Sequence, residues 1–150
     1  QKNIKNGKDF YMIGGMGHST SVSLSHSIFS KFQTICLDGD GSMIMHLGSF
    51  VACAKYSKNF KYIVINNHSH ESVGGQKTNS DIINFKKLSE SFGFDKYIFI
   101  KRKNNLSLII KKFLDFKGNI FLEVNVGLGS LKNLNRPKNF IDIKNNFISK

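Results

Sequence analysis

The segment that determines the predicted fold is Thr34-Ile35-Cys36-Leu37-Asp38-Gly39-Asp40-Gly41-Ser42, in which an apolar strand runs into a glycine-rich turn. A helical pattern follows over residues 43–56, and a second apolar run over residues 62–65 ends in Asn66-Asn67. Two strands joined by a helix predict a parallel βαβ unit, because such crossovers are almost always right-handed. Strands and helices alternate along the rest of the chain. The sequence therefore predicts an α/β protein with a doubly wound, mostly parallel sheet and helices on both faces.

Oxygen-bearing side chains follow both of these predicted strands. Asp40 and Asn67 come after the carboxyl ends, where open α/β sheets bind ligands, and their oxygens are of the kind that Mg²⁺ prefers. Gly39 and Gly41 allow a ligand to approach the backbone closely. Ser42 is expected to cap the next helix, whose amino end favours an anion. The turn therefore predicts a magnesium-bridged diphosphate; the alternative is a tight structural turn with a capping Asp.

These residues resemble a known cofactor motif. Gly39-Asp40-Gly41-Ser42, followed at the expected distance by Asn66-Asn67, is similar to the thiamine diphosphate-binding motif. The resemblance implies that Asp40, Asn67 and the main-chain carbonyl of Ser69 hold magnesium. It also implies that the glycines and the serine of the turn border the cofactor, and that the chain has the thiamine diphosphate-binding fold, of which it matches the diphosphate-binding domain.

Two further segments resemble 2-oxo acid decarboxylases that use this cofactor. Residues 14–19, Gly-Gly-Met-Gly-His-Ser, are similar to a glycine-rich segment of these enzymes, and residues 66–76 are similar to a segment of the phosphonopyruvate decarboxylase family. By this resemblance, the carbonyl of Gly14 accepts a hydrogen bond from the cofactor's aminopyrimidine. Met16 would be the wedge that bends the cofactor into a V shape; a methionine there is otherwise a core filler.

Three histidines are candidates for catalysis. His18 follows the glycine turn, and it either faces the cofactor and substrate or caps the next helix. His46 lies one helical turn past Ser42, and it is either a substrate-side residue or a partly exposed polar one. His70 lies in the loop over residues 68–80, where it is interpreted as a proton donor or a phosphonate ligand; the alternative is a solvated, mobile loop.

The resemblance implies decarboxylation of 3-phosphonopyruvate to phosphonoacetaldehyde and CO₂ with thiamine diphosphate and magnesium. Gln76, Lys77 and Arg136 are the expected substrate contacts. Arg136 belongs to residues 129–137, which resemble the family's closing segment, but Leu131 stands where the family has an arginine, and this weakens the assignment to phosphonates. Two alternatives stay open: a subunit of a sulfopyruvate decarboxylase or of another 2-oxo acid decarboxylase, and a non-catalytic or truncated cofactor-binding module.

Enzymes of this type need a second domain that presents a Glu to the cofactor's pyrimidine ring, and no segment of this chain resembles it. We therefore expect one domain over residues 1–150, with residues 1–8 as a lead-in and residues 138–150 as a tail. A partner domain or subunit is expected to supply the Glu, which predicts a homo- or hetero-oligomer.

Composition narrows the classes of partner. The formal net charge of +12 is spread along 150 residues without a nucleic-acid recognition motif, so we predict no nucleic-acid partner. No apolar run is long enough for a membrane span. Cys36 and Cys53 lack metal-ligand spacing and are expected to be buried, reduced thiols of a cytoplasmic protein. The short apolar run over residues 9–13 predicts an additional inner strand.

Overall fold

The structure is a computed structural model that describes residues 9–101, 105–129 and 138–149. These residues fall into two units. The larger unit spans residues 15–129 and contains the sheet. The smaller unit consists of residues 9–14 together with residues 138–149.

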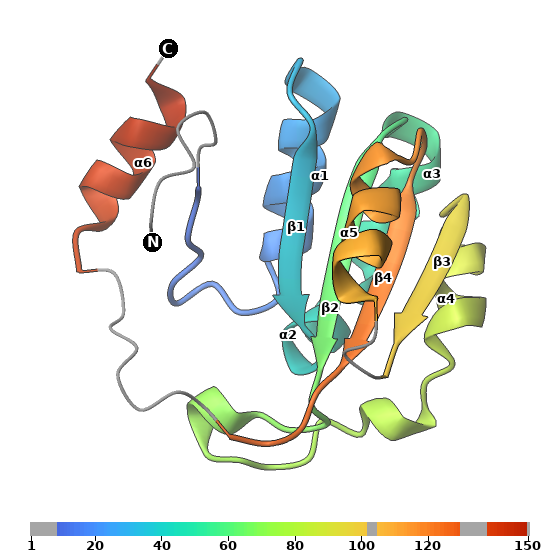
Figure 1. The fold of residues 1–150 in the computed structure, drawn as a ribbon. Helices are drawn as coiled ribbons and strands as arrows, with labels where there is room; N and C mark the ends of the chain where they lie inside the picture. The colour runs from blue at the N-terminus through green and yellow to red at the C-terminus, as the bar shows by residue number, and fades with distance from the viewer. Residues whose placement is uncertain (1–8, 102–104, 130–137, 150) are drawn as a thin grey trace. The chain divides into compact units, whose positions relative to one another are not determined.

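Within the described residues, the sheet has four strands: β1 (Thr34–Gly39), β2 (Phe60–Asn66), β3 (Lys96–Ile100) and β4 (Ile120–Asn125). All are parallel, and their spatial order is β1-β2-β4-β3 (Figure 1). The register pairs Gly39 with Ile65 and Asn66 with Asn125, so the carboxyl ends of β1, β2 and β4 meet at one edge. The predicted parallel α/β fold is confirmed, and the segments that follow these strands start side by side.

Helices cover both faces of the sheet, as predicted. The helices that pack on one face are α1 (Ser19–Phe29), α2 (Asp40–Met45), the 3₁₀ helix η1 (Leu47–Ala52), α3 (Cys53–Tyr56) and α4 (Phe85–Ser91). On the other face lies α5 (Leu106–Asp115), whose buried Phe113 packs with Ile120 and Leu122 of β4. Cys36 and Cys53 are buried and neither forms a disulfide, which agrees with the prediction for both.

An aromatic cluster holds the first of these faces together. The rings of Phe50 and Tyr62 meet edge to face with centroids 4.8 Å apart, and those of Phe94 and Phe121 do so at 5.3 Å. Burial of each such ring contributes about 1.5–3 kcal/mol to folding. Because Phe50 lies in η1 and Tyr62 in β2, the cluster fixes the chain that follows the glycine-rich turn against the middle of the sheet.

The prediction of a single helix over residues 43–56 is wrong in two respects: the helix begins earlier, and it is not continuous. Helix α2 begins at Asp40 and ends at Met45, because His46 has φ −136° and ψ 47°, outside the helical region. The chain continues as η1 and α3. The expected helix cap by Ser42 is also wrong: Gly39 occupies the N-cap position, and Ser42 lies inside α2, where its Oγ accepts a hydrogen bond from Gly17 N at 2.9 Å.

The smaller unit lacks the inner strand that the apolar run over residues 9–13 predicts, since none of these residues is in a strand. This unit contains an aromatic contact instead of a strand at residues 9–13. The ring of Phe10 lies 5.3 Å from that of Phe147, on helix α6 (Phe140–Ile148). Helix α6 is capped by Asn139, whose side chain accepts from Asp142 N at 3.3 Å.

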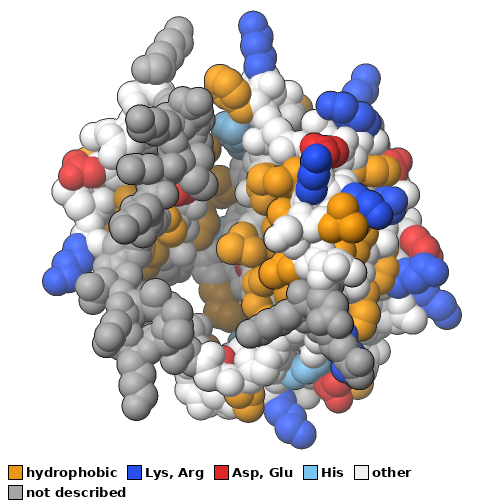
Figure 2. Space-filling model, viewed as in Figure 1, with side chains coloured by type: hydrophobic (Ala, Val, Ile, Leu, Met, Phe, Trp, Pro, Cys, Tyr) orange, Lys and Arg blue, Asp and Glu red, His pale blue; other side chains and the backbone are white. Residues whose placement is uncertain are grey.

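On the face shown in Figure 2, lysine side chains are scattered, and hydrophobic side chains gather over α5. Several apolar side chains of the larger unit are exposed, among them Ile35 and Leu37 of edge strand β1. None of the helices in the described part of the chain is long and apolar enough to cross a membrane.

Candidate cofactor-binding site

Two glycine-rich turns lie against each other at the carboxyl edge of the sheet. The turn before α1 is tied to α2 by the bond from Gly17 N to Ser42 Oγ. A second bond joins the start of α1 to the end of β1, because Ser19 Oγ donates to Asp38 Oδ2 at 2.5 Å. The structure thus brings Gly17 and Ser19, from the segment over residues 14–19 that the sequence assigns to cofactor binding, next to the second such segment, which follows β1 over residues 39–42.

Asp38 is a residue of this site that sequence reasoning missed. Its Oδ2 also accepts from Tyr62 OH at 2.9 Å, and its Oδ1 accepts from Gly39 N at 2.9 Å. The side chain is 7% exposed. Burial, together with the negative charge of Asp38, raises the pKa of Tyr62, which therefore stays a donor. The sequence could have indicated Asp38, because it places a carboxylate at the end of an apolar strand. A carboxylate that is buried there needs hydrogen-bond partners.

The predicted metal ligands Asp40 and Asn67 lie just after two neighbouring strands. Asp40 is the first residue of α2 and is only 2% exposed, and its Oδ2 accepts from Thr78 Oγ1 at 2.5 Å. Asn67 directly follows β2, and its Oδ1 accepts from Ser69 N at 3.1 Å. A carboxylate and an amide oxygen, with the nearby carbonyl of Ser69, fit the few hard oxygen ligands that proteins give to Mg²⁺.

The residues around Gly41 also fit a bound anionic group. A Cβ at Gly41 would lie 2.4 Å from His70 Cε1, 2.5 Å from His70 Nδ1 and 2.9 Å from Thr78 Cγ2, so only glycine fits between these side chains. His70 Nδ1 is buried and has no hydrogen-bond partner among the described residues. Native proteins satisfy nearly all buried polar atoms, and an orphaned one needs an explanation such as a missing ligand or water.

His18 and His46 form a pair beside the first turn. Their ring centroids are 4.4 Å apart with the planes at 50°, and both residues are exposed. His46 packs so closely on Gly17 that a Cβ there would lie 2.1 Å from His46 Nδ1. His18 occupies the N-cap position of α1, but its side chain makes no capping hydrogen bond, and its Nδ1 lies 3.3 Å from Met16 O.

The loop between β2 and α4 contains Asn67 and Ser69 and contacts Asp40 through Thr78. Ser69 and Lys77 form an antiparallel bridge, and short 3₁₀ turns, η2 (Glu71–Val73) and η3 (Ser80–Ile82), complete the loop. Gln76 and Lys77, the expected substrate contacts, are both exposed. Arg136 lies outside the described residues. Gly14, with φ +80°, belongs to the smaller unit, and its role stays a prediction, as does that of the half-buried Met16.

A buried network of side-chain hydrogen bonds supports this loop. Ser80 Oγ donates to Asn66 Oδ1 at 3.0 Å, and Asn66 Nδ2 donates to Glu123 Oε1 at 2.9 Å. Tyr97 OH donates to the second oxygen of Glu123 at 2.5 Å, and burial together with this carboxylate raises the pKa of Tyr97. This network of hydrogen bonds fixes Asn66, the residue before the predicted metal ligand Asn67.

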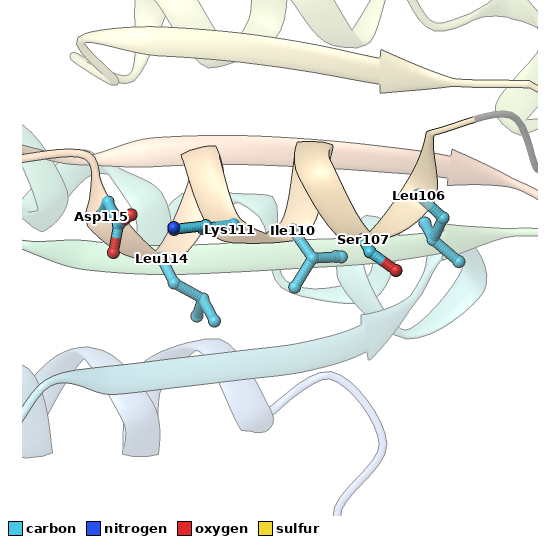
Figure 3. Close-up of a pocket in the computed structure, with 6 residues that line it drawn as sticks. All are labelled: Leu106, Ser107, Ile110, Lys111, Leu114 and Asp115. Carbon is cyan, nitrogen blue, oxygen red and sulfur yellow. The ribbon is translucent and has the colours of Figure 1, made fainter.

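The sheet edge and the surface depression shown in Figure 3 are different places. The depression runs along α5, and its lining consists of Leu106, Ser107, Ile110, Lys111, Leu114 and Asp115. Leu106, Ile110 and Leu114 point the same way from the helix (Figure 3). None of the predicted cofactor or metal residues lines it, so it has no part in the candidate site.

A parallel sheet with two glycine-rich turns and oxygen ligands at its carboxyl edge is the architecture of a cofactor-binding α/β domain. The family described as thiamine pyrophosphate enzyme, C-terminal TPP binding domain, matches residues 3–124. The chain belongs to this family. Its cofactor, thiamine pyrophosphate, is the compound also called thiamine diphosphate.

Relatives of two kinds match this chain. The phosphonopyruvate decarboxylase of Streptomyces viridochromogenes is 30% identical over 130 residues, which are 86% of this chain and 33% of that protein. The sulfopyruvate decarboxylase subunit beta of Methanothermobacter thermautotrophicus is 32% identical over 124 residues, 82% of this chain and 64% of that subunit. The subunit beta of Methanocaldococcus jannaschii is 33% identical over 90 residues, 59% of this chain and 48% of that subunit. The chain thus spans less than two thirds of the length of each of these relatives.

Proposed function

We propose that this protein supplies the diphosphate- and metal-binding half of the active site of a thiamine diphosphate-dependent decarboxylase. The observation that carries the proposal is the placement of Asp40 and Asn67 after paired strands, with the carboxylate of Asp40 buried and held by Thr78. The family match and the decarboxylase names of the relatives support the reaction class.

The residues have separate proposed roles. Asp40, Asn67 and the carbonyl of Ser69 would hold Mg²⁺, which would bridge to the cofactor diphosphate beside Gly41. Gly39 and Ser42 complete that turn, and Ser42 also holds the first turn through Gly17 N. The bound cofactor supplies the electron sink that allows a 2-oxo acid to lose CO₂.

The histidines are proposed to act on the substrate. Nδ1 of His70 is buried beside Gly41 without a hydrogen-bond partner among the described residues, and we propose that this ring acts on a bound molecule either as a proton donor or as a ligand of the acidic head group. His18 and His46 are exposed beside the first turn and would face the same space. Gln76, Lys77 and Arg136 are the proposed additional contacts to substrate.

The proposed substrate is 3-phosphonopyruvate, with phosphonoacetaldehyde and CO₂ as products. Sulfopyruvate is the second candidate, because relatives named sulfopyruvate decarboxylase subunit beta match at similar identity. Their name also supports a partner chain for this protein, which would present the Glu that activates the cofactor. A cofactor-binding module without catalysis remains the third candidate.

The test is calorimetric titration of thiamine diphosphate into the protein with and without Mg²⁺, beside an Asp40→Ala variant. We expect Mg²⁺-dependent binding in the wild type and its loss in the variant. Absence of Mg²⁺-dependent binding in the wild type would overturn the proposal. With the partner chain added, turnover of phosphonopyruvate compared with sulfopyruvate then decides the substrate, and turnover of neither would favour the non-catalytic module.

A further inference from the structure

Glu71 holds the side chain of the predicted metal ligand Asn67. Asn67 Nδ2 donates a hydrogen bond to Glu71 Oε2 at 2.7 Å, and the other carboxylate oxygen, Oε1, accepts from Gly129 N at 2.7 Å. We propose that Glu71 is a positioning residue that fixes the amide of Asn67 with its oxygen available to the metal. The proposal rests on the proposed function of the site.

The chemistry of the two side chains gives Glu71 this role. An amide has a donor end and an acceptor end that are almost equal in shape, so contact area alone does not decide its orientation. An ionised carboxylate only accepts hydrogen bonds. Glu71 therefore selects the amide orientation in which Nδ2 of Asn67 faces it. Oδ1 is then directed elsewhere, where it accepts from Ser69 N at 3.1 Å.

The selected orientation is the one that a cation requires. Mg²⁺ binds oxygen, and an amide turned by 180° would present two N–H groups to it instead. Because Oδ1 of Asn67 already lies on the side of Ser69, the amide oxygen and the backbone of Ser69 are on the same side of the loop. Glu71 does not touch the metal in this arrangement; it acts through Asn67.

Glu71 is itself anchored by the sheet. Gly129 follows β4, and the register places the end of β4 beside the end of β2, since Asn66 pairs with Asn125. The bond from Gly129 N thus ties the loop to the segment that follows β4. Together with the bond from Asn67 Nδ2, it fixes the orientation of the Glu71 carboxylate. A glutamine at position 71 has a single acceptor end, so either Asn67 Nδ2 or Gly129 N would face its amide N–H₂ group.

The test is calorimetric titration of Mg²⁺ into the protein in the presence of thiamine diphosphate. The variants are Glu71→Ala and Glu71→Gln, with Asp81→Asn as the matched control, because Asp81 is an exposed carboxylate of the same loop. Loss of the hydrogen bond that orients Asn67 should weaken Mg²⁺ binding about 3- to 10-fold in Glu71→Ala. Glu71→Gln should lie between Glu71→Ala and the wild type, because its amide oxygen can face only one of the two donors, Asn67 Nδ2 or Gly129 N. Asp81→Asn should stay close to the wild type, because it removes the same charge without the hydrogen bond.

Two readouts separate positioning from a general structural role. Without metal and cofactor, the thermal midpoint of Glu71→Ala should be close to that of the wild type. The side-chain amide protons of Asn67, observed by NMR, should exchange faster with solvent in the variant. The inference alone would be overturned if Glu71→Ala kept the Mg²⁺ affinity of the wild type, or if its thermal midpoint without metal fell clearly below that of the wild type. A wild type that binds no Mg²⁺ would overturn the proposed function as well.

Discussion

Ser19 Oγ donates a hydrogen bond of 2.5 Å to Asp38 Oδ2, and so the first residue of α1 is fixed to the end of β1. The same oxygen accepts from Tyr62 OH, which lies in β2. One carboxylate therefore sets the position of both glycine-rich turns relative to the middle of the sheet. This arrangement prepares the candidate site before any ligand binds, because the turns do not have to be ordered by the cofactor.

The first prediction concerns this carboxylate. Asp38→Ala should lower the free energy of unfolding by about 2–4 kcal/mol, because it leaves the buried Tyr62 OH and two further donors without their acceptor. Tyr62→Phe removes one of the bonds and should cost only about 1 kcal/mol. Urea unfolding followed by circular dichroism measures both. A cost for Asp38→Ala no larger than that for Tyr62→Phe would contradict the central role of Asp38.

The second prediction tests the contact between Gly41 and His70. Gly41→Ala should destabilise the protein by about 1–3 kcal/mol, because the added methyl group overlaps the His70 ring. The double variant Gly41→Ala/His70→Ala should regain at least half of that loss. Unfolding free energies of the four proteins form a double-mutant cycle, in which contacting residues are expected to be non-additive. Simple addition of the two single effects would mean that the ring does not lie on Gly41.

The third prediction concerns His70 in catalysis. If His70 donates a proton or holds the head group of the substrate, His70→Ala should reduce turnover by about 100-fold with thiamine diphosphate affinity nearly intact. The measurement is steady-state decarboxylation with the proposed partner chain, beside calorimetry of cofactor binding. A parallel loss of cofactor affinity would assign His70 to the diphosphate instead of the substrate.

The fourth prediction is a pH dependence. Burial, and secondarily the charge of Asp95, raises the pKa of the Cys53 thiol from 9.0 to about 12. Between these values the unfolded chain loses the thiol proton and the folded chain keeps it, so stability present below pH 9.0 is lost as the pH rises toward 12. The contribution of one thiol is at most about 1.4 kcal/mol per pH unit.

Cys53→Ala isolates this contribution. The variant should be less stable than the wild type at neutral pH, by about 1 kcal/mol for the lost sulfur contacts. Its stability should then fall less steeply between pH 9 and 11, where Cys53 would otherwise titrate. Denaturant unfolding at several pH values gives both slopes. Parallel pH curves for wild type and variant would show that the thiol keeps an ordinary pKa in the fold.

Most of the fold is predictable because hydrophobic periodicity is a local signal. The runs that became β1, β2, β3 and β4 are short, apolar and separated by helical patterns, which is typical of parallel α/β proteins. The break at His46 was not predictable in this way. His46 contacts Gly17 and His18, residues that lie far from it in sequence, and no local pattern indicates these contacts.

The candidate site was predictable only where residue type and spacing carry the chemistry. Asp40 and Asn67 follow strands and bear the oxygens that a cation needs, so the sequence alone singles them out. Asp38 and Glu71 act through partners elsewhere in the chain, Tyr62 for one and Gly129 for the other. No local pattern encodes these pairings, because they arise from the register of the sheet.

The order of the strands has a consequence for the folding pathway. Pairing of β1 with β2, and of β3 with β4, joins strands that are successive in sequence. The pairing of β2 with β4 joins strands that are separated in the sequence by α4, β3 and α5. Contacts of low sequence separation close with less entropic cost. We therefore expect Asp40, Asn67 and Thr78 to be assembled early, on the first half of the larger unit. The bond from Gly129 N to Glu71 joins both halves of the sheet and can form only when the central strand pairing is complete.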